Sequence, residues 1–165
     1  LLTNSKSFLK PLLNKPLNWL IPVLLLLSFI GFIDATYLAA KFYLGEPVTC
    51  LLFTGCDTVA QSPYATVMGI PISLPGALYY AAVFFLLVLY LDIRQNWIPR
   101  LLVSLTLLGF GVALYLTYLQ VFIIKALCFY CLVSALDSTL LFGLSVWVIK
   151  KLESTNQNES EITKN

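Results

Sequence analysis

The chain contains four cysteines, and they form two pairs with different spacing. Cys50 and Cys56 lie in a polar break between hydrophobic runs, whereas Cys128 and Cys131 form a C-x-x-C at the start of the last run. A thiolate can attack a disulfide sulfur, form a mixed disulfide and be displaced by a second thiol. In a C-x-x-C the second thiol is close by, and one of the two often has a lowered pKa. These residues therefore indicate dithiol–disulfide exchange.

The elements that position these cysteines are predicted to be membrane helices. The sequence is 59% hydrophobic and 11% charged, whereas a soluble domain is about 45–50% apolar and about 25% charged. A helix that crosses the bilayer core requires about 20 apolar residues. Four segments come close to this length: residues 19–42, 74–91, 101–124 and 128–149. We therefore predict an all-α membrane protein, a bundle of four transmembrane helices.

One membrane domain accounts for most of the chain. We predict this domain over residues 19–150, after a segment at 1–18 and before a polar tail at 151–165 that is disordered from Ser154 onward. The connection at 43–73 is the only long one, and its glycines and prolines break helices. Within it, residues 59–62 have two interpretations, a short helix that covers a pocket or a plain loop.

The distribution of lysine and arginine predicts the orientation in the membrane. If the helices alternate in direction, most basic residues fall on one side, namely Lys6, Lys10, Lys15, Arg94, Arg100, Lys150, Lys151 and Lys164. Only Lys41 and Lys125 fall on the other side. Because cytoplasmic loops carry the excess of basic residues, we expect both termini to be cytoplasmic. All four cysteines then lie at the outer face, where disulfides form and persist.

Electrons that reach a membrane C-x-x-C need an acceptor. A haem attachment motif is absent because Leu132, rather than histidine, follows Cys131. Dinucleotide and flavin fingerprints are absent as well. We therefore expect a lipid-soluble quinone, which can reach a pocket in the helix bundle from the bilayer. Cys128 should lie at a helix N-terminus, whose dipole favours a thiolate, and Lys125 adds a nearby positive charge.

Aromatic residues in the spans supply candidates for the wall of a quinone pocket. The main candidates are Tyr79, Tyr80, Phe84 and Tyr115, with Phe85 and Tyr118 beside them. The alternative is that these rings pack between helices or anchor them at the membrane interface, which is the commoner role of aromatic residues in such helices. Tyr130 lies inside the C-x-x-C and is a supporting candidate.

Two aspartates, Asp34 and Asp137, fall inside the predicted spans. Ionisable residues within a membrane are costly and indicate function by default. One interpretation is that the two acids share a proton or deliver one to a reduced quinone. The other, which we favour from the sequence, is a pair of hydrogen bonds between helices with one acid protonated.

The chain also resembles a known family over residues 19–149. The likeness is carried by the run Cys50…Gly55-Cys56-Asp57…Ser62-Pro63-Tyr64-Ala65…Gly69-Ile70-Pro71…Gly76, followed by Cys128-Phe129-Tyr130-Cys131, which resembles the bacterial-type branch of the vitamin K epoxide reductase family. The resemblance implies four helices around a quinone, with Cys131 contacting the quinone and Cys128 exchanging with Cys56. It also implies a Cys50–Cys56 disulfide, contact between Cys50 and a soluble redox partner, and a hydrogen-bonding role for Ser62 near the cysteines.

Two departures from that family narrow the expected partner and substrate. Many bacterial members carry a fused thioredoxin-like domain, whereas a polar tail stands here, so the resemblance implies a separate periplasmic thioredoxin-fold partner of the DsbA type. Vertebrate members have a tyrosine four residues after the C-x-x-C that helps to bind vitamin K, and Ala135 occupies that position. A bacterial menaquinone or ubiquinone is therefore favoured over vitamin K epoxide. DsbB-type quinone oxidases carry the two cysteine pairs in the reverse order, which separates them from this chain.

These observations together predict a thiol–disulfide oxidoreductase in the bacterial inner (plasma) membrane. Electrons pass from the reduced partner through Cys50 and Cys56, then through Cys128 and Cys131, to a quinone, and this supports disulfide bond formation. No metal and no nucleic acid is expected to take part. A same-chemistry alternative is a reductase of quinone or vitamin K epoxide that is driven by partner thiols.

Three alternative interpretations of the cysteines involve no redox turnover. The first is a membrane scaffold or transporter with structural disulfides. The second is a structural zinc site of four thiolates. The third is that the cysteines serve only as small buried hydrophobes. The redox interpretation is favoured over the last two because all four cysteines gather at one predicted membrane face.

Overall fold

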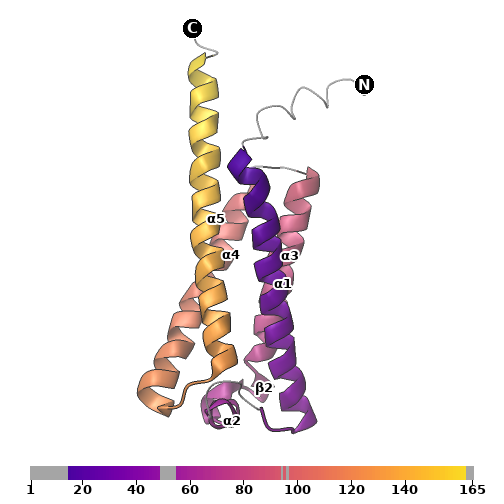
Figure 1. Ribbon diagram of the computed structural model, residues 1–165, viewed down its shortest axis with the longest axis vertical. Coiled ribbons are helices and arrows are strands. Elements are labelled where there is room, and N and C mark those ends of the chain that lie inside the picture. Colours follow the sequence, from indigo (N-terminus) through magenta and orange to yellow (C-terminus); the bar gives the residue numbers. More distant parts are fainter. Residues whose placement is uncertain (1–14, 49–54, 94, 96, 163–165) are drawn as a thin grey trace.

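The computed structural model describes residues 15–48, 55–93, 95 and 97–162, and long helices dominate it. The helices are α1 (Lys15–Leu44), α3 (Ser73–Ile93), α4 (Trp97–Tyr118) and α5 (Phe129–Ile162). A short π-helical turn, η2 (Leu119–Ile124), extends α4. Figure 1 shows the long helices side by side in one bundle.

Each long helix contains an apolar segment of membrane-spanning length. These segments are Trp19–Leu44, Ser73–Ile93, Trp97–Ile124 and Phe129–Lys151, and their mean hydropathy lies between 1.8 and 2.0. Many large side chains on their outer faces are exposed, including Leu26, Ile33, Leu78 and Phe85. A helix that is apolar on the outside as well as the inside is typical of a membrane span. The predicted four-helix membrane bundle is confirmed.

The bundle is held together by an apolar core to which every long helix contributes. Helix α1 packs mainly on α3, and α5 packs on both α4 and α1. The core side chains of α1 and α3 include Leu24, Tyr80 and Val83, and those of α4 and α5 include Leu102 and Leu141. With no hydrophobic force between helices inside lipid, close packing of such side chains is the main source of helix association.

The connection between α1 and α3 folds across one end of the bundle. It contains α2 (Cys56–Ala60), a 3₁₀ turn (Pro63–Ala65), and a hairpin of β1 (Thr66–Val67) and β2 (Ile70–Pro71). The hairpin turns through Met68 and Gly69, which both have positive φ, as a two-residue type I′ connection requires. The short helix considered for residues 59–62 exists, but it begins at Cys56 and ends at Ala60.

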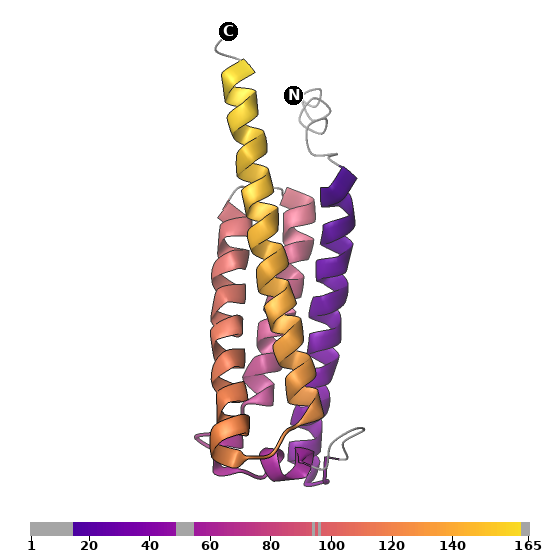
Figure 2. The same ribbon diagram turned by 60° about the vertical axis from the view of Figure 1, so that its left-hand side comes forward.

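The helix bundle begins and ends on the side that lies away from α2. In Figures 1 and 2 the first turn of α1 and the last turns of α5 lie at one end, and α2 lies at the other. Helix α5 continues to Ile162, so the predicted disorder is wrong for residues 154–162. Extending an existing helix is far easier than starting one, and no glycine or proline follows Lys150 to end it.

Candidate redox site

The C-x-x-C lies where η2 turns into α5. Cys128 directly precedes the first residue of α5, as predicted, and Cys131 lies in its first turn. The turn between η2 and α5 passes through Lys125, which adopts a left-handed conformation with φ of 55°. Gln120 holds this turn closed, because its backbone carbonyl accepts from the Ala126 N–H at 3.2 Å. Its side-chain Oε1 accepts from the Cys128 N–H at 3.0 Å.

Cys128 and Cys131 both carry free thiols. Cys128 is only 2% exposed, and the Cys131 backbone N–H donates to its sulfur at 3.5 Å. Hydrogen bonding from the Cys131 thiol, with further bonds from the backbone of Cys131 and Tyr130, lowers the pKa of Cys128 to about 7 despite burial. Donors that point at a sulfur favour its charged form. Of the two thiols, Cys128 is therefore the one whose thiolate form is favoured near neutral pH.

The loop cysteine Cys56 lies close to this pair. Cys56 is disulfide-bonded and 1% exposed. It shares one small apolar cluster with Cys128, Val48 and Val59, and Cys131 packs against that cluster. The structure thus gathers three of the four predicted cysteines, whereas Cys50 lies outside the described residues.

Gly55 allows the loop to approach the C-x-x-C this closely. A Cβ atom placed on Gly55 would lie 2.7 Å from the Leu127 carbonyl oxygen and 3.0 Å from the Leu127 nitrogen. Real side chains do not approach a backbone that closely, so this position has room only for hydrogen. The start of α2 therefore lies directly against the segment that leads into Cys128.

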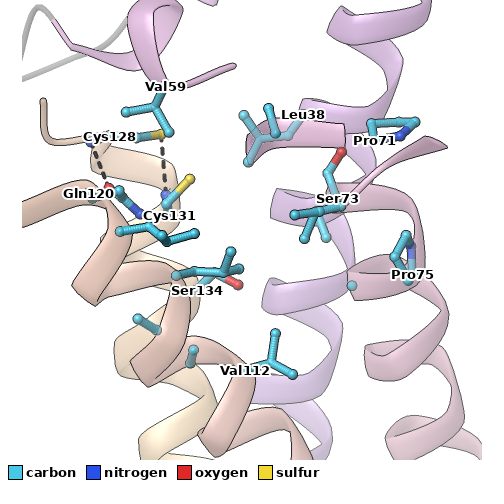
Figure 3. Close-up of a pocket in the computed structure, with 18 of the residues that line it drawn as sticks. Leu38, Val59, Pro71, Ser73, Pro75, Val112, Gln120, Cys128, Cys131 and Ser134 are labelled. Carbon is cyan, nitrogen blue, oxygen red and sulfur yellow. Dashed lines mark hydrogen bonds between the residues drawn. The ribbon is translucent and has the colours of Figure 1, made fainter. Parts of the chain in front are cut away.

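An apolar cavity of about 300 Å³ lies between the four long helices beneath α2 and β2. Its apolar lining includes Leu38, Val112 and Leu116. Its polar lining consists of Asp34, Ser62, Ser73, Tyr64, Tyr79, Tyr80, Gln120, Ser134 and Ser138, together with both cysteines of the C-x-x-C. Figure 3 shows the sulfur of Cys131 pointing into this cavity, with Cys128 held at its edge by the bond to Gln120.

Comparison with known proteins identifies the family of this chain. A sequence model described as the vitamin K epoxide reductase family matches residues 22–146, which is most of the chain. The chain belongs to this family. None of the curated proteins matches it. Family membership and the four spanning segments together make the protein an integral membrane oxidoreductase of the vitamin K epoxide reductase type, one that acts on a quinone or its epoxide.

Two of the predicted pocket residues line the cavity of this family member, and two do not. Tyr79 and Tyr80 form part of the wall. Phe84 lies one helical turn farther along α3, where its ring packs against Phe29 at a centroid distance of 6.4 Å. Tyr115 turns outward from α4 and is 58% exposed. The neighbouring candidates Phe85 and Tyr118 are also exposed and lie outside the cavity wall.

The two supporting candidates occupy different positions. Ser62 lines the cavity, and its hydroxyl donates to the Val59 carbonyl at 2.8 Å, which secures the end of α2. Tyr130 is not among the residues that line the cavity and packs on Tyr37 of α1, with ring centroids 5.1 Å apart. Its contact joins the start of α5 to α1 beside the cysteines.

Four residues that contact the tyrosines of α3 were not found from the sequence, namely Gly31, Gly109, Ser134 and Ser138. The Tyr80 hydroxyl lies 2.9 Å from the Ser134 carbonyl and 2.9 Å from the Ser138 hydroxyl, which joins α3 to α5 at the cavity wall. The Tyr80 ring fits against Gly31, and the Tyr79 ring fits against Gly109, where a Cβ would overlap each ring. Polar residues and glycines inside otherwise apolar spans are the signal that was available.

The sequence analysis favoured a pair of inter-helix hydrogen bonds for the two membrane aspartates, and three of their carboxyl oxygens are instead buried without a partner within hydrogen-bond distance. Asp34 lines the cavity, and its Oδ2 is buried without a hydrogen-bond partner. Asp137 is 4% exposed, and neither of its carboxyl oxygens has a hydrogen-bond partner among the described residues. No hydrogen bond pairs the two aspartates at these three oxygens, although Tyr80 of α3 lies near enough to Asp137 of α5 to act on its carboxyl.

Proposed function

We propose that this protein passes electrons from a reduced, separate thioredoxin-fold partner of the DsbA type to a quinone. The electrons enter at Cys50 and Cys56 and leave through Cys128 and Cys131, and the result is disulfide formation in the partner. The observation that carries this proposal is the position of the C-x-x-C between two environments. Cys128 contacts the apolar cluster of Cys56, while the Cys131 sulfur points into the cavity.

The first exchange takes place between the partner and the loop pair. Cys56 is disulfide-bonded, and the resemblance to the family implies Cys50 as its partner. A thiolate of the reduced partner attacks Cys50, and the partner's second thiol then resolves the mixed disulfide. The partner leaves oxidised, and Cys50 and Cys56 are left as a dithiol.

The second exchange takes place between the loop and the membrane pair. Cys56 attacks Cys128 of an oxidised C-x-x-C, and Cys50 then attacks Cys56 to restore the loop disulfide and release Cys128. The products are an oxidised loop and a reduced C-x-x-C. The described cysteines are compatible with these products, because Cys56 is disulfide-bonded and both C-x-x-C thiols are free.

The cavity has the character of a quinone site. Its volume of about 300 Å³ is at the lower end of the range for small-molecule pockets. A quinone ring is flat and apolar and carries two carbonyl acceptors, and the buried Tyr79 hydroxyl has no hydrogen-bond partner. We assign Tyr79 as a donor to one quinone carbonyl. Ala135 lines the cavity where vertebrate relatives carry a tyrosine, which favours menaquinone or ubiquinone over vitamin K epoxide.

Ser62 and Tyr130 support the exchange by position. Ser62 ties down the end of α2, which carries Cys56 at its start. Tyr130 fixes the first turn of α5 against α1. We assign the cysteine end of the bundle to the extracytoplasmic side of a bacterial plasma membrane, because the basic residues cluster towards the opposite end.

The test is quinone reduction by purified protein with a reduced thioredoxin-fold substrate as the electron donor. Wild-type protein should convert the soluble analogue ubiquinone-1 to its quinol, and Cys131→Ala should abolish this reaction. Cys50→Ala should lose turnover with the protein substrate, while its C-x-x-C still reacts with ubiquinone-1. Full turnover in all four single cysteine variants would refute the redox assignment. Cys56→Ala should trap the natural partner as a mixed disulfide on Cys50.

A further inference from the structure

Two carboxyl groups lie inside the bundle beside the cavity, and neither is used in the electron route. Asp34 on α1 lines the cavity with an unpartnered Oδ2. Asp137 on α5 lies just outside the cavity wall, 4% exposed and without a hydrogen bond to either oxygen. A carboxylate in such surroundings would be an unpaired buried charge, which proteins avoid by keeping the group neutral. The pair is therefore a store of at least one proton inside the membrane.

The two acids and the tyrosines of α3 lie near enough to one another for the charge on one group to act on the others. Asp137 interacts electrostatically with Asp34, and Tyr80 interacts with both acids. Tyr79, which lies beside Tyr80 on α3, interacts electrostatically with Asp137 of α5. Neither lysine nor arginine lines the cavity among the described residues. The remaining titratable groups of the wall are Tyr64 from the 3₁₀ turn and the two C-x-x-C thiols, and α4 contributes none.

The reaction needs a proton that the cysteines do not supply. Reduction of a quinone to a quinol takes two electrons and two protons. Oxidation of the C-x-x-C to a disulfide releases two electrons, but its thiolate form carries only one proton, on Cys131. Because Cys128 has already lost its proton near neutral pH, the second proton has another source. Asp34 is the only carboxyl group that lines the cavity among the described residues.

We propose that Asp34 is the acid that gives this second proton to the quinone substrate. This inference rests on the proposed quinone reduction. The Cys128 thiolate, the Cys131 thiol, the quinone and the Asp34 carboxyl become a Cys128–Cys131 disulfide, a quinol and the Asp34 carboxylate. One negative charge is present before and after the step. Asp34 regains a proton from water when the quinol leaves.

The experiment compares quinone reduction by full-length protein in lipid nanodiscs across pH 6 to 9. Dithiothreitol is the reductant, ubiquinone-1 is the acceptor, and kcat is measured for wild type, Asp34→Asn and Asp34→Glu. Positioned acids contribute about 100-fold or more, so Asp34→Asn should lose about 100-fold in kcat at pH 8. Its kcat relative to wild type should fall about tenfold per pH unit above pH 7, because solvent must then supply the proton.

Two further variants complete the design. Asp34→Glu keeps an acid in the cavity, so its kcat relative to wild type should stay constant across this pH range. Asp92→Asn is the matched control, because Asp92 is exposed near the far end of α3, and it should behave as wild type. Alkylation of the cysteines should show that disulfide exchange between the loop and the C-x-x-C is unchanged in Asp34→Asn.

The outcomes separate the two proposals. If wild-type protein does not reduce ubiquinone-1, the proposed function fails, and this inference fails with it. If wild type turns over and Asp34→Asn keeps both its kcat and its pH profile, only this inference is overturned. If Asp34→Asn does not fold, infrared difference spectroscopy on wild type during a single turnover, before the quinol leaves, decides. Loss of a protonated carboxyl band is expected, and an unchanged band overturns the proposal.

Discussion

Cys128 and Cys131 are separated by less than one helical turn but differ in reactivity. The sulfur of Cys128 lies at the N-terminal end of α5, where backbone N–H groups have no partners within the helix. The hydrogen-bond donors of the C-x-x-C therefore point at Cys128, as the Cys131 N–H does. These donors lower its pKa to about 7. Above this value Cys128 is a thiolate, and as the pH falls below it the thiolate is lost.

This assignment predicts the pH dependence of Cys128 alkylation. In a Cys50→Ala/Cys56→Ala background, the rate with iodoacetamide should reach a plateau above about pH 8 and fall about tenfold per unit below pH 6. Adding Cys131→Ala removes the main donor, so the midpoint should move up towards the ordinary thiol value of about 8.5. Peptide mass spectrometry can follow Cys128 alone. A midpoint that does not move would show that the Cys131 thiol is not the cause.

Tyr79 gives a second prediction, one for substrate binding. Its hydroxyl is buried at the cavity wall without a hydrogen-bond partner, so a quinone carbonyl is the acceptor that would satisfy it. A hydrogen bond of this kind contributes about 1 kcal/mol. Tyr79→Phe should therefore raise the KM for ubiquinone-1 about fivefold and leave cysteine alkylation unchanged. Tyr115→Phe, on an exposed ring outside the cavity, is the control, and an equal effect of both variants would contradict the assignment.

At the scale of elements, the contact between α2 and the turn before α5 decides whether the two cysteine pairs can react. Gly55 makes that contact possible, because the backbone of Leu127 occupies the place of its missing side chain. Backbone atoms cannot move aside as a flexible side chain can. Any larger residue at this position therefore lifts Cys56 away from Cys128.

We predict that Gly55→Ala slows exchange between the pairs about 10- to 100-fold, since misplacement of reacting groups by about 1 Å has effects of this size. The measurement is a single turnover from a reduced loop and an oxidised C-x-x-C, stopped by acid and alkylation. Reduction of ubiquinone-1 by a pre-reduced C-x-x-C should be unchanged. Gly111→Ala is the control, because a Cβ there meets no atom within 4 Å. Slower exchange in both variants would point to a general effect on the bundle.

The elements were largely predictable from the sequence, whereas their contacts were not. Apolar runs of spanning length locate four helices because lipid requires every backbone group to be bonded within its own segment. The C-x-x-C at a helix start followed from where one such run begins. The contacts of Gly55, Gly31 and Gly109 depend on where helices and loops cross, which no local pattern encodes. The same holds for Phe84 and Tyr115, whose residue type suited a pocket but whose helix faces point elsewhere.

At the scale of the whole molecule, the two ends of the bundle differ in chemistry. One end holds α2, the hairpin and the cysteine cluster. The first turn of α1 and the last turns of α5 lie at the other end (Figure 2). The cavity lies beneath the cysteine end, where residues of α2 and β2 form part of its wall. In the proposed function, a soluble donor would approach the loop from water, while a quinone would approach the same cysteines through the bilayer. This separation of the two substrates depends on which end faces the cytoplasm.

The orientation can be tested by reporter fusions in a bacterial host. The positive-inside rule places the start of α1 and the end of α5 in the cytoplasm and the hairpin outside it. Alkaline phosphatase, which needs disulfides to be active, should be active when inserted between Met68 and Gly69, at an exposed turn where Met68 is 99% exposed. The same enzyme fused after Asn165 should be inactive, whereas a green fluorescent protein fused there should fluoresce. The opposite pattern would place the cysteines in the reducing cytoplasm, where the proposed formation of disulfides in a partner could not persist.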